Sequence, residues 1–225
     1  MDLTKQYNNV ANDFLANHDI GENSNRLNRE HFYSHIDFLT PGTKLLDLAC
    51  GDGTDLVYYK SLGAEIYGLD ASELLIDAAH QKLPGEKIEV GLFEQIPYED
   101  DFFDAVLSKY AIMTSSDMRP VFKEIHRVLK PGGTMLYLVT HPFRQFFEKK
   151  DQSADYFEQT IVDSLILNGS LTVQEPSHTM GEFLNDFLFT NFDVQAYDEK
   201  WDPAAEQIDG KRYPGYFILK AKKRS

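Results

Sequence analysis

A turn rich in small residues is the part of this sequence best suited to holding a ligand. Residues 44–48 have the composition of a buried strand and residues 54–62 that of a helix, and Ala49, Gly51 and Gly53 lie between them. Small side chains let a ligand approach the backbone, and the amides of the turn and of the helix start can donate hydrogen bonds to it. These features suit a phosphate or a carboxylate.

A carboxylate stands at the end of the next predicted strand. Asp70 follows residues 65–69 and lies 23 residues after Asp47, which itself precedes the turn. A carboxylate at this place can accept hydrogen bonds from both hydroxyls of a ribose, so Asp70 indicates a ligand that contains adenosine. The alternative role for Asp70 is to cap the following helix, although Ser72 could serve as that cap.

The turn departs from the dinucleotide-binding fingerprint Gly-x-Gly-x-x-Gly. Leu56 stands where a third glycine is needed for close packing of helix on strand, and Asp52 puts a negative charge inside the turn. That charge would repel a pyrophosphate. The turn therefore favours a different adenosine-containing ligand over a nicotinamide dinucleotide.

A parallel sheet is needed to bring these residues together. Between about residues 43 and 140, short apolar segments alternate with amphipathic segments of helical length, which is typical of βαβ units. The predicted strands are residues 44–48, 65–69, 87–91, 104–108 and 134–140, and the predicted helices are residues 54–62, 72–82 and 117–129. Open α/β sheets bind ligands at the carboxyl ends of their strands, where the turn and Asp70 both fall.

The flanking regions are less regular. Residues 1–40 are predicted to be a helical extension, most clearly over residues 26–39. Residues 141–177 show no clean period, and we interpret them as an insertion that covers the carboxyl ends of the strands. The remaining predicted elements are a helix over residues 179–189 and strands over residues 192–197 and 213–222.

Three segments carry a family resemblance. Residues 47–54 read Asp-Leu-Ala-Cys-Gly-Asp-Gly-Thr, residues 94–104 read Glu-Gln-Ile-Pro-Tyr-Glu-Asp-Asp-Phe-Phe-Asp, and residues 124–133 end in Arg-Val-Leu-Lys-Pro-Gly-Gly. Together they resemble motifs of the class I, Rossmann-like methyltransferases that use S-adenosylmethionine, in the branch that acts on small molecules. Ala49 takes the place of the first glycine of that family's first motif. The resemblance is strong over about residues 40–140 and weak elsewhere.

The resemblance implies an α/β fold with a doubly wound, mostly parallel seven-stranded sheet whose last strand is antiparallel. It implies a helical N-terminal lid over residues 1–40 and a methyltransferase domain over residues 41–225, with a lid insertion at about residues 141–177. S-adenosylmethionine would be the cofactor and S-adenosylhomocysteine the product. The implied cofactor-binding residues are Tyr7, Asp47, Ala49, Gly51, Gly53, Asp70, Ala71, Leu92, Phe93, Ser108 and Tyr110.

The implied roles at the methionine end come from the first motif. Ala49, Gly51 and Gly53 would surround the methionine part of the cofactor, and Asp47 would hold the loop through backbone hydrogen bonds. Ser108, at the end of the fourth strand, would border the same end of the ligand.

The remaining implied roles concern the adenosine end and the cover. Leu92 and Phe93 would lie beside the adenine, and because many relatives carry Asp at the position of Leu92, we expect this leucine to contribute packing only. Ala71 adjoins the ribose-binding carboxylate. Tyr7 would cover the cofactor or pack on the surface, and Tyr110 would face the methyl group or pack in the core.

Two histidines are candidate general bases for a methyl transfer. His141 follows the fifth strand and His178 begins a predicted helix, and both positions resemble histidines of the small-molecule branch. Histidine titrates near neutral pH, so either could accept a proton from an acceptor; the alternative is that each binds a backbone group. No metal is expected, since His31 and His35 share a helical face without a Cys or acidic partner that completes a site.

The composition narrows the classes of partner. A formal net charge of −14 would repel phosphate backbones, which disfavours nucleic acid and favours a small-molecule acceptor. No apolar run approaches the roughly 20 residues that span a bilayer, so no membrane partner is expected. The single cysteine, Cys50, fits a reducing cytoplasm, and we expect a monomer or a homodimer.

The predicted function is transfer of a methyl group from S-adenosylmethionine to an oxygen or nitrogen of a small-molecule acceptor. A nicotinamide-dependent oxidoreductase is disfavoured by Leu56 and by the Lys-Pro-Gly-Gly segment at residues 130–133. A module that binds S-adenosylmethionine without catalysis stays open, because methyl transfer requires so few residue types.

Overall fold

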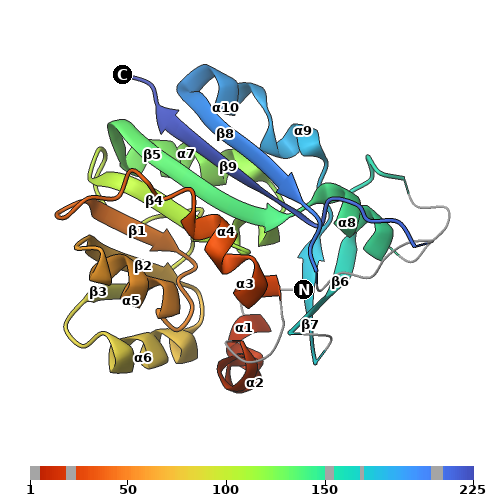
Figure 1. The fold of residues 1–225 in the computed structure, drawn as a ribbon, viewed down its shortest axis with the longest axis horizontal. Coiled ribbons are helices and arrows are strands. Elements are labelled where there is room, and N and C mark those ends of the chain that lie inside the picture. Colours follow the sequence, from red (N-terminus) through yellow and green to blue (C-terminus); the bar gives the residue numbers. More distant parts are fainter. Residues whose placement is uncertain (1–5, 19–23, 150–154, 168–169, 204–209) are drawn as a thin grey trace.

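One seven-stranded sheet organises the computed structural model, which describes residues 6–18, 24–149, 155–167, 170–203 and 210–225. Its strands are β1 (Lys44–Leu48), β2 (Glu65–Asp70), β3 (Lys87–Val90), β4 (Phe103–Lys109), β5 (Leu129–Thr140), β8 (Phe192–Lys200) and β9 (Tyr216–Lys223). They lie in the order β3-β2-β1-β4-β5-β9-β8 (Figure 1). Adjacent strands from β3 to β5 are parallel, and β9 is antiparallel to both of its neighbours. The predicted sheet is confirmed.

Helices cover both faces of this sheet, because side chains on successive strand positions point to opposite sides. The side chains of Leu46 and Val106 lie on the face of the sheet that α7 (Met118–Val128) covers. Leu45 and Ala105 pack against the opposite face, which is covered by the two helices that follow β1 and β2. Those helices are α5 (Thr54–Ser61) and α6 (Glu73–Lys82). The strands are therefore buried on both sides, as is typical of parallel sheets.

The N-terminal region is helical but more broken than predicted. It contains α1 (Gln6–Asn9), α2 (Ala11–Asn17), α3 (Ser24–Leu27) and α4 (Arg29–Tyr33). The helix predicted over residues 26–39 ends at Tyr33, and turns closed by the amides of His35 and Leu39 follow it. These turns let Ile36 as well as Phe32 reach the core.

The insertion contains a hairpin that sequence analysis did not detect. The described part of the insertion contains α8 (Pro142–Glu148), β6 (Ile161–Ile166) and β7 (Leu171–Pro176). The two strands form the hairpin, which is a separate antiparallel sheet. Along β6, the buried side of the alternation includes polar Ser164 and the exposed side includes apolar Ile161 and Leu165. Because polar and apolar residues occupy the reverse of their usual sides, the sequence does not show the alternation that is typical of a half-buried strand.

Two further predictions about element boundaries were wrong. Strand β5 begins at Leu129 rather than at residue 134, because the Lys-Pro-Gly-Gly segment is absorbed by a register shift opposite β4. The helix predicted over residues 179–189 is divided into α9 (Met180–Phe183) and α10 (Asp186–Asn191). Asn185 starts the second helix by accepting the Leu188 amide at 2.9 Å. Among the described residues, no helix has the length and apolar character that crossing a bilayer requires.

Candidate functional site

The turn after β1 has a left-handed backbone, which favours glycine. Ala49, Gly51 and Gly53 all have positive φ angles, of 59°, 55° and 75°. A Cβ added at Gly51 would meet no atom within 4 Å, so this glycine faces open space. A Cβ at Gly53 would lie 3.2 Å from the Cβ of Ala79 and 3.3 Å from Leu83, both outside the turn. Gly51 therefore serves the cavity, whereas Gly53 serves packing against α6.

Asp70 holds this turn in place. Its Oδ2 accepts the Gly51 amide at 2.9 Å, and its Oδ1 accepts the Ser72 amide at 2.9 Å. Ser72 in turn caps α6 by accepting the Leu75 amide. Burial raises the pKa of the Asp70 carboxyl, although the backbone hydrogen bonds oppose that rise. Asp70 thus joins the turn to the start of α6 and still lines the cavity.

Asp47 lies on β1 directly before the turn, but its side chain makes no hydrogen bond to the turn among the described residues. Its side chain is buried, and burial together with the nearby Asp55 raises the pKa of its carboxyl well above the usual range. The amides of the turn donate hydrogen bonds to the Asp70 carboxylate and to backbone carbonyls, not to Asp47. The prediction that Asp47 holds the loop is therefore not reproduced by the contacts of the described residues.

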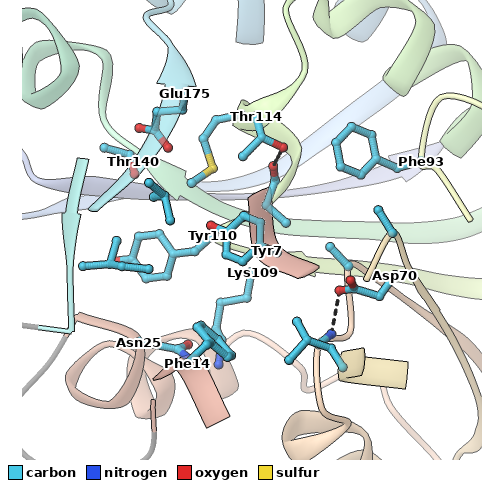
Figure 2. Close-up of a pocket in the computed structure, with 18 of the residues that line it drawn as sticks. Tyr7, Phe14, Asn25, Asp70, Phe93, Lys109, Tyr110, Thr114, Thr140 and Glu175 are labelled. Carbon is cyan, nitrogen blue, oxygen red and sulfur yellow. Dashed lines mark hydrogen bonds between the residues drawn. The ribbon is translucent and has the colours of Figure 1, made fainter. Parts of the chain in front are cut away.

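The turn opens into a cavity with two ends. At one end lie Ala49, Gly51, Asp70, Ala71, Leu92 and Phe93, all predicted to bind the cofactor. Figure 2 shows Asp70 and Phe93 on one side of the view and Glu175 and Thr140 on the other. Asp47, Gly53 and Ser108 are not part of the lining; Ser108 instead donates a hydrogen bond to the Leu48 carbonyl.

Glu175 is the main functional candidate that sequence reasoning missed. It lies on β7, lines the second end of the cavity and is only 1% exposed. Its Oε1 accepts hydrogen bonds from Gln145 at 2.9 Å and from Ser164 at 3.0 Å. Burial raises the pKa of this carboxyl. No motif marks Glu175, because its position depends on the undetected hairpin.

Two cationic side chains of the described residues line the cavity, and each forms an ion pair with a carboxylate outside the lining. Lys109 forms an ion pair with Asp55, which lies on α5 outside the cavity. Arg144 pairs with Asp202 at 2.7 Å and with Glu148 at 3.0 Å. Neither cation is therefore available as an isolated positive charge for an anionic ligand.

Two tyrosines lie between the ends of the cavity. Figure 2 shows Tyr7 and Tyr110 at its centre. Burial, reinforced by Glu175 and Asp70, raises the pKa of the Tyr7 hydroxyl, so the phenol stays neutral. Tyr110 has a positive φ of 54°, and its hydroxyl accepts a hydrogen bond from Asn28 at 2.8 Å. Tyr110 lines the cavity and packs against the core, and its position facing the methyl group stays a prediction.

The two candidate histidine bases lie outside the cavity lining. His141 caps α8, since its Nδ1 accepts the Phe143 amide at 3.1 Å, and its Nε2 lies 3.3 Å from Glu199. His178 is buried, and its Nε2 lies 2.9 Å from the Met113 carbonyl. Both contacts match the alternative reading in which each histidine binds a backbone group.

Helix α1 contributes Tyr7 to the cavity lining and bonds to two separate elements. Gln6 donates to the Gln174 carbonyl at 2.7 Å and accepts the Gln174 amide at 2.8 Å, which ties α1 to β7. Asn8 accepts hydrogen bonds from the Ser72 hydroxyl at 3.1 Å and the Leu74 amide at 3.2 Å. Helix α1 therefore connects the hairpin to the start of α6.

A second cluster of polar groups lies away from the cavity. Within the described part of the chain, His31, His35 and Asp198 have ligand atoms within 4.8 Å of one another. Asp198 accepts from His31 Nε2 at 2.8 Å and comes from β8, so the acidic partner absent from the local sequence is supplied by a distant strand. Tyr216 completes the cluster by pairing with His31 Nδ1.

Comparisons with known proteins agree with this geometry. Residues 46–137 match the family described as a methyltransferase domain. The chain is 37% identical over 105 residues to an uncharacterized methyltransferase of Synechocystis, covering 46% of this chain and 50% of that protein. It is 34% identical over 118 residues to a demethylmenaquinone methyltransferase of Lysinibacillus sphaericus, covering 48% of this chain and 50% of the relative. The chain thus spans about half the length of these relatives.

A solved structure extends the likeness to the whole fold. The S-adenosylmethionine-dependent methyltransferase from Mesorhizobium loti superposes with a TM-score of 0.72 at 20% identity, covering 87% of this chain and 97% of that one. Residues 46–137 therefore match a methyltransferase domain, and the chain shares the fold of this solved S-adenosylmethionine-dependent methyltransferase.

Proposed function

We propose that this protein transfers a methyl group from S-adenosylmethionine to an oxygen or nitrogen of a small molecule bound beneath the insertion. One observation carries the proposal: a single cavity joins the turn after β1 to polar side chains of the hairpin. A cofactor and an acceptor bound at the two ends would meet near Tyr7 and Tyr110.

The residues at the first end suit S-adenosylmethionine. The open space at Gly51 admits a ligand against the backbone, and the carboxylate of Asp70 can accept hydrogen bonds from ribose hydroxyls. Leu92 and Phe93 offer apolar contact to an adenine. When bound, the cofactor supplies a methyl group already activated by a sulfonium. The protein then has to position the acceptor and exclude water, a proximity effect of roughly 7–11 kcal/mol.

The proposal extends to the partners and location of the protein. The net charge of −14 supports a small acceptor rather than a nucleic acid. A free Cys50 supports the cytoplasm, and we propose a monomer or a homodimer.

Isothermal titration with S-adenosylhomocysteine, with NAD in parallel, tests the cofactor. We expect micromolar binding of the first and none of the second. Asp70→Ala should weaken S-adenosylhomocysteine binding about 10- to 100-fold, because charge-assisted hydrogen bonds contribute about 1.5–3 kcal/mol each. Unchanged affinity in Asp70→Ala would refute the ribose assignment, and binding of NAD alone would refute the proposed function.

A further inference from the structure

Glu175 is a buried carboxylate with one oxygen left for a ligand. Both of its hydrogen bonds, from Gln145 and Ser164, reach Oε1. Oε2 accepts no hydrogen bond from the described residues. It is not one of the fully buried side-chain atoms that lack a partner, so it is accessible. Because Glu175 lines the cavity, Oε2 faces the cavity. The carboxylate is thus held at one oxygen and presented at the other.

The carboxylate is rigidly supported. Gln145 is fully buried, and its side chain also donates to the Pro176 carbonyl at 3.2 Å and accepts the His178 amide at 3.0 Å. Ser164 lies on β6, directly across the hairpin from the strand that carries Glu175. The three side chains form one network, so Glu175 cannot turn away without breaking it.

Glu175 has no counter-ion in the described part of the chain. The nearby Arg144 is engaged by Asp202 and Glu148, and no ion pair of Glu175 is formed. A buried charge without a partner is costly. A ligand that brings a positive charge removes that cost, whereas a hydroxyl gives a hydrogen bond and leaves the charge uncompensated.

We propose that Glu175 Oε2 binds the acceptor and accepts its proton, and that the acceptor is a primary or secondary amine. This inference rests on the proposed methyl transfer. The amine binds as an ammonium against Oε2. A proton then passes from the nitrogen to Oε2, and the nitrogen keeps the electron pair of the broken N–H bond.

Burial makes this proton transfer feasible. A low-dielectric site disfavours both charged forms, which raises the pKa of a carboxyl and lowers that of an amine. The pair therefore approaches balance between ammonium carboxylate and neutral amine with carboxylic acid. The cofactor supplies a methyl carbon whose bond to sulfur breaks with both electrons on sulfur as the nitrogen pair bonds to it. The proton on Oε2 passes to solvent when the product leaves.

The rest of the cavity suits such an amine. Aromatic faces of Tyr7 and Tyr110 lie at its centre, and cations are attracted to aromatic faces. Ile166 and Val173 of the hairpin add apolar surface for the body of the acceptor. The acidic surface of the whole chain attracts cations over longer distances.

The test uses matched probes on the full chain saturated with S-adenosylhomocysteine. Saturation-transfer NMR would compare the amine, alcohol and carboxylate of the n-butyl, n-hexyl and 2-phenylethyl series. We expect at least one amine to bind with a Kd about tenfold or more below those of its alcohol and carboxylate counterparts. Glu175→Gln should remove this preference and leave the Kd of S-adenosylhomocysteine unchanged. The matched control, Glu158→Gln, changes an exposed glutamate of the same insertion and should keep the preference.

The outcomes separate the two proposals. Failure of the wild-type protein to bind S-adenosylhomocysteine would refute the proposed function. Binding of S-adenosylhomocysteine without an amine preference in any series would refute the role of Glu175 alone. The wild-type comparison decides this even if Glu175→Gln does not fold. Persistence of the preference in folded Glu175→Gln would also overturn the inference.

Discussion

Among the described side chains that line the cavity, the cations form ion pairs, whereas Asp70 and Glu175 do not. Burial raises the pKa values of Asp70 and Glu175, and the cations beside them, Lys109 and Arg144, are taken up by other carboxylates. The cavity thus offers carboxylate oxygens at both ends without free positive charge. The end of the cavity that holds Glu175 therefore disfavours an anionic acceptor, because an anion would add to the uncompensated negative charge.

The two glycines of the turn provide a matched pair of substitutions. Gly51→Ala and Gly53→Ala both place a side chain at positive φ, which costs roughly 1–2 kcal/mol. Gly51→Ala adds a methyl group to open space in the cavity, so we expect S-adenosylhomocysteine to bind about tenfold or more weakly. Isothermal titration measures this loss.

Gly53→Ala should show the opposite balance. Its new Cβ would press on Ala79 and Leu83, and such overpacking costs about 1–3 kcal/mol more. Thermal unfolding should therefore report a larger loss of stability for Gly53→Ala than for Gly51→Ala. Equal Kd values in the two folded variants would contradict the assignment of Gly51 to the cavity.

Helix α1 is short, and its contacts reach two separate elements. Its four residues bond to β7 through Gln6 and to the start of α6 through Asn8. A short helix has little intrinsic stability, so these side chains hold α1 in place. Opening of α1 would expose the cavity without disturbing the sheet.

Asn8→Ala should accelerate ligand release. It removes two hydrogen bonds, each contributing about 0.5–1.5 kcal/mol, and we expect the dissociation rate of S-adenosylhomocysteine to rise about fivefold or more. Stopped-flow displacement measures this rate. Asn9→Ala is the control, since Asn9 is exposed on the same helix. Equal rates for both variants would show that α1 does not cover the ligand.

Elements with a strong hydrophobic period could be predicted from the sequence. The strand predicted over residues 44–48 is reproduced as β1, and the helix over residues 72–82 differs from α6 by one residue. The hairpin could not be predicted, because Ser164 is buried and Leu165 exposed against the usual pattern. Asn185 divides a continuous apolar period into two helices by capping, which a periodicity argument does not register.

Site residues were predictable only where a local motif carries them. Ala49, Gly51 and Asp70 belong to contiguous segments and line the cavity, and their binding of the cofactor stays a prediction. Asn28 and Glu175 reach the site from the two least regular regions, and their partners lie 82 and 30 residues away in the chain. Spacing cannot reveal such contacts. His141 and His178 follow motif-like positions, but neither is part of the cavity lining.

The molecule has a large net negative charge, and its carboxyl groups include some with raised and some with lowered pKa values. Burial raises the pKa values of Asp47, Asp70 and Glu175. For Asp52, burial also acts upward, but hydrogen bonds from His18 and Lys82 outweigh it and hold the pKa well below the usual range. Carboxyls with lowered pKa values stabilise the fold above the pKa of the unfolded chain, and those with raised values stabilise it below their folded pKa.

Stability should therefore be greatest in mild acid. Between the unfolded and folded pKa values of the raised carboxyls, the native state binds more protons than the unfolded chain, so stability falls as the pH rises. The net charge of −14 acts in the same direction, since protonation relieves repulsion. We expect Tm to rise as the pH is lowered from neutral towards the unfolded pKa of the raised carboxyls, and to fall in stronger acid as groups such as Asp52 become protonated.

Asp47→Asn isolates the contribution of one buried carboxyl to this profile. Asp47 lies outside the cavity lining, so the substitution removes a titrating group with little effect on the ligand site. The asparagine carries no charge at high pH, and the decline of Tm as the pH rises from mild acid should become shallower than in the wild type. Scanning calorimetry across this range measures the slope. Parallel profiles for the two proteins would mean that Asp47 titrates alike in the folded and unfolded chains, and the alkaline decline would then have to come from Asp70, Glu175 and the net charge alone.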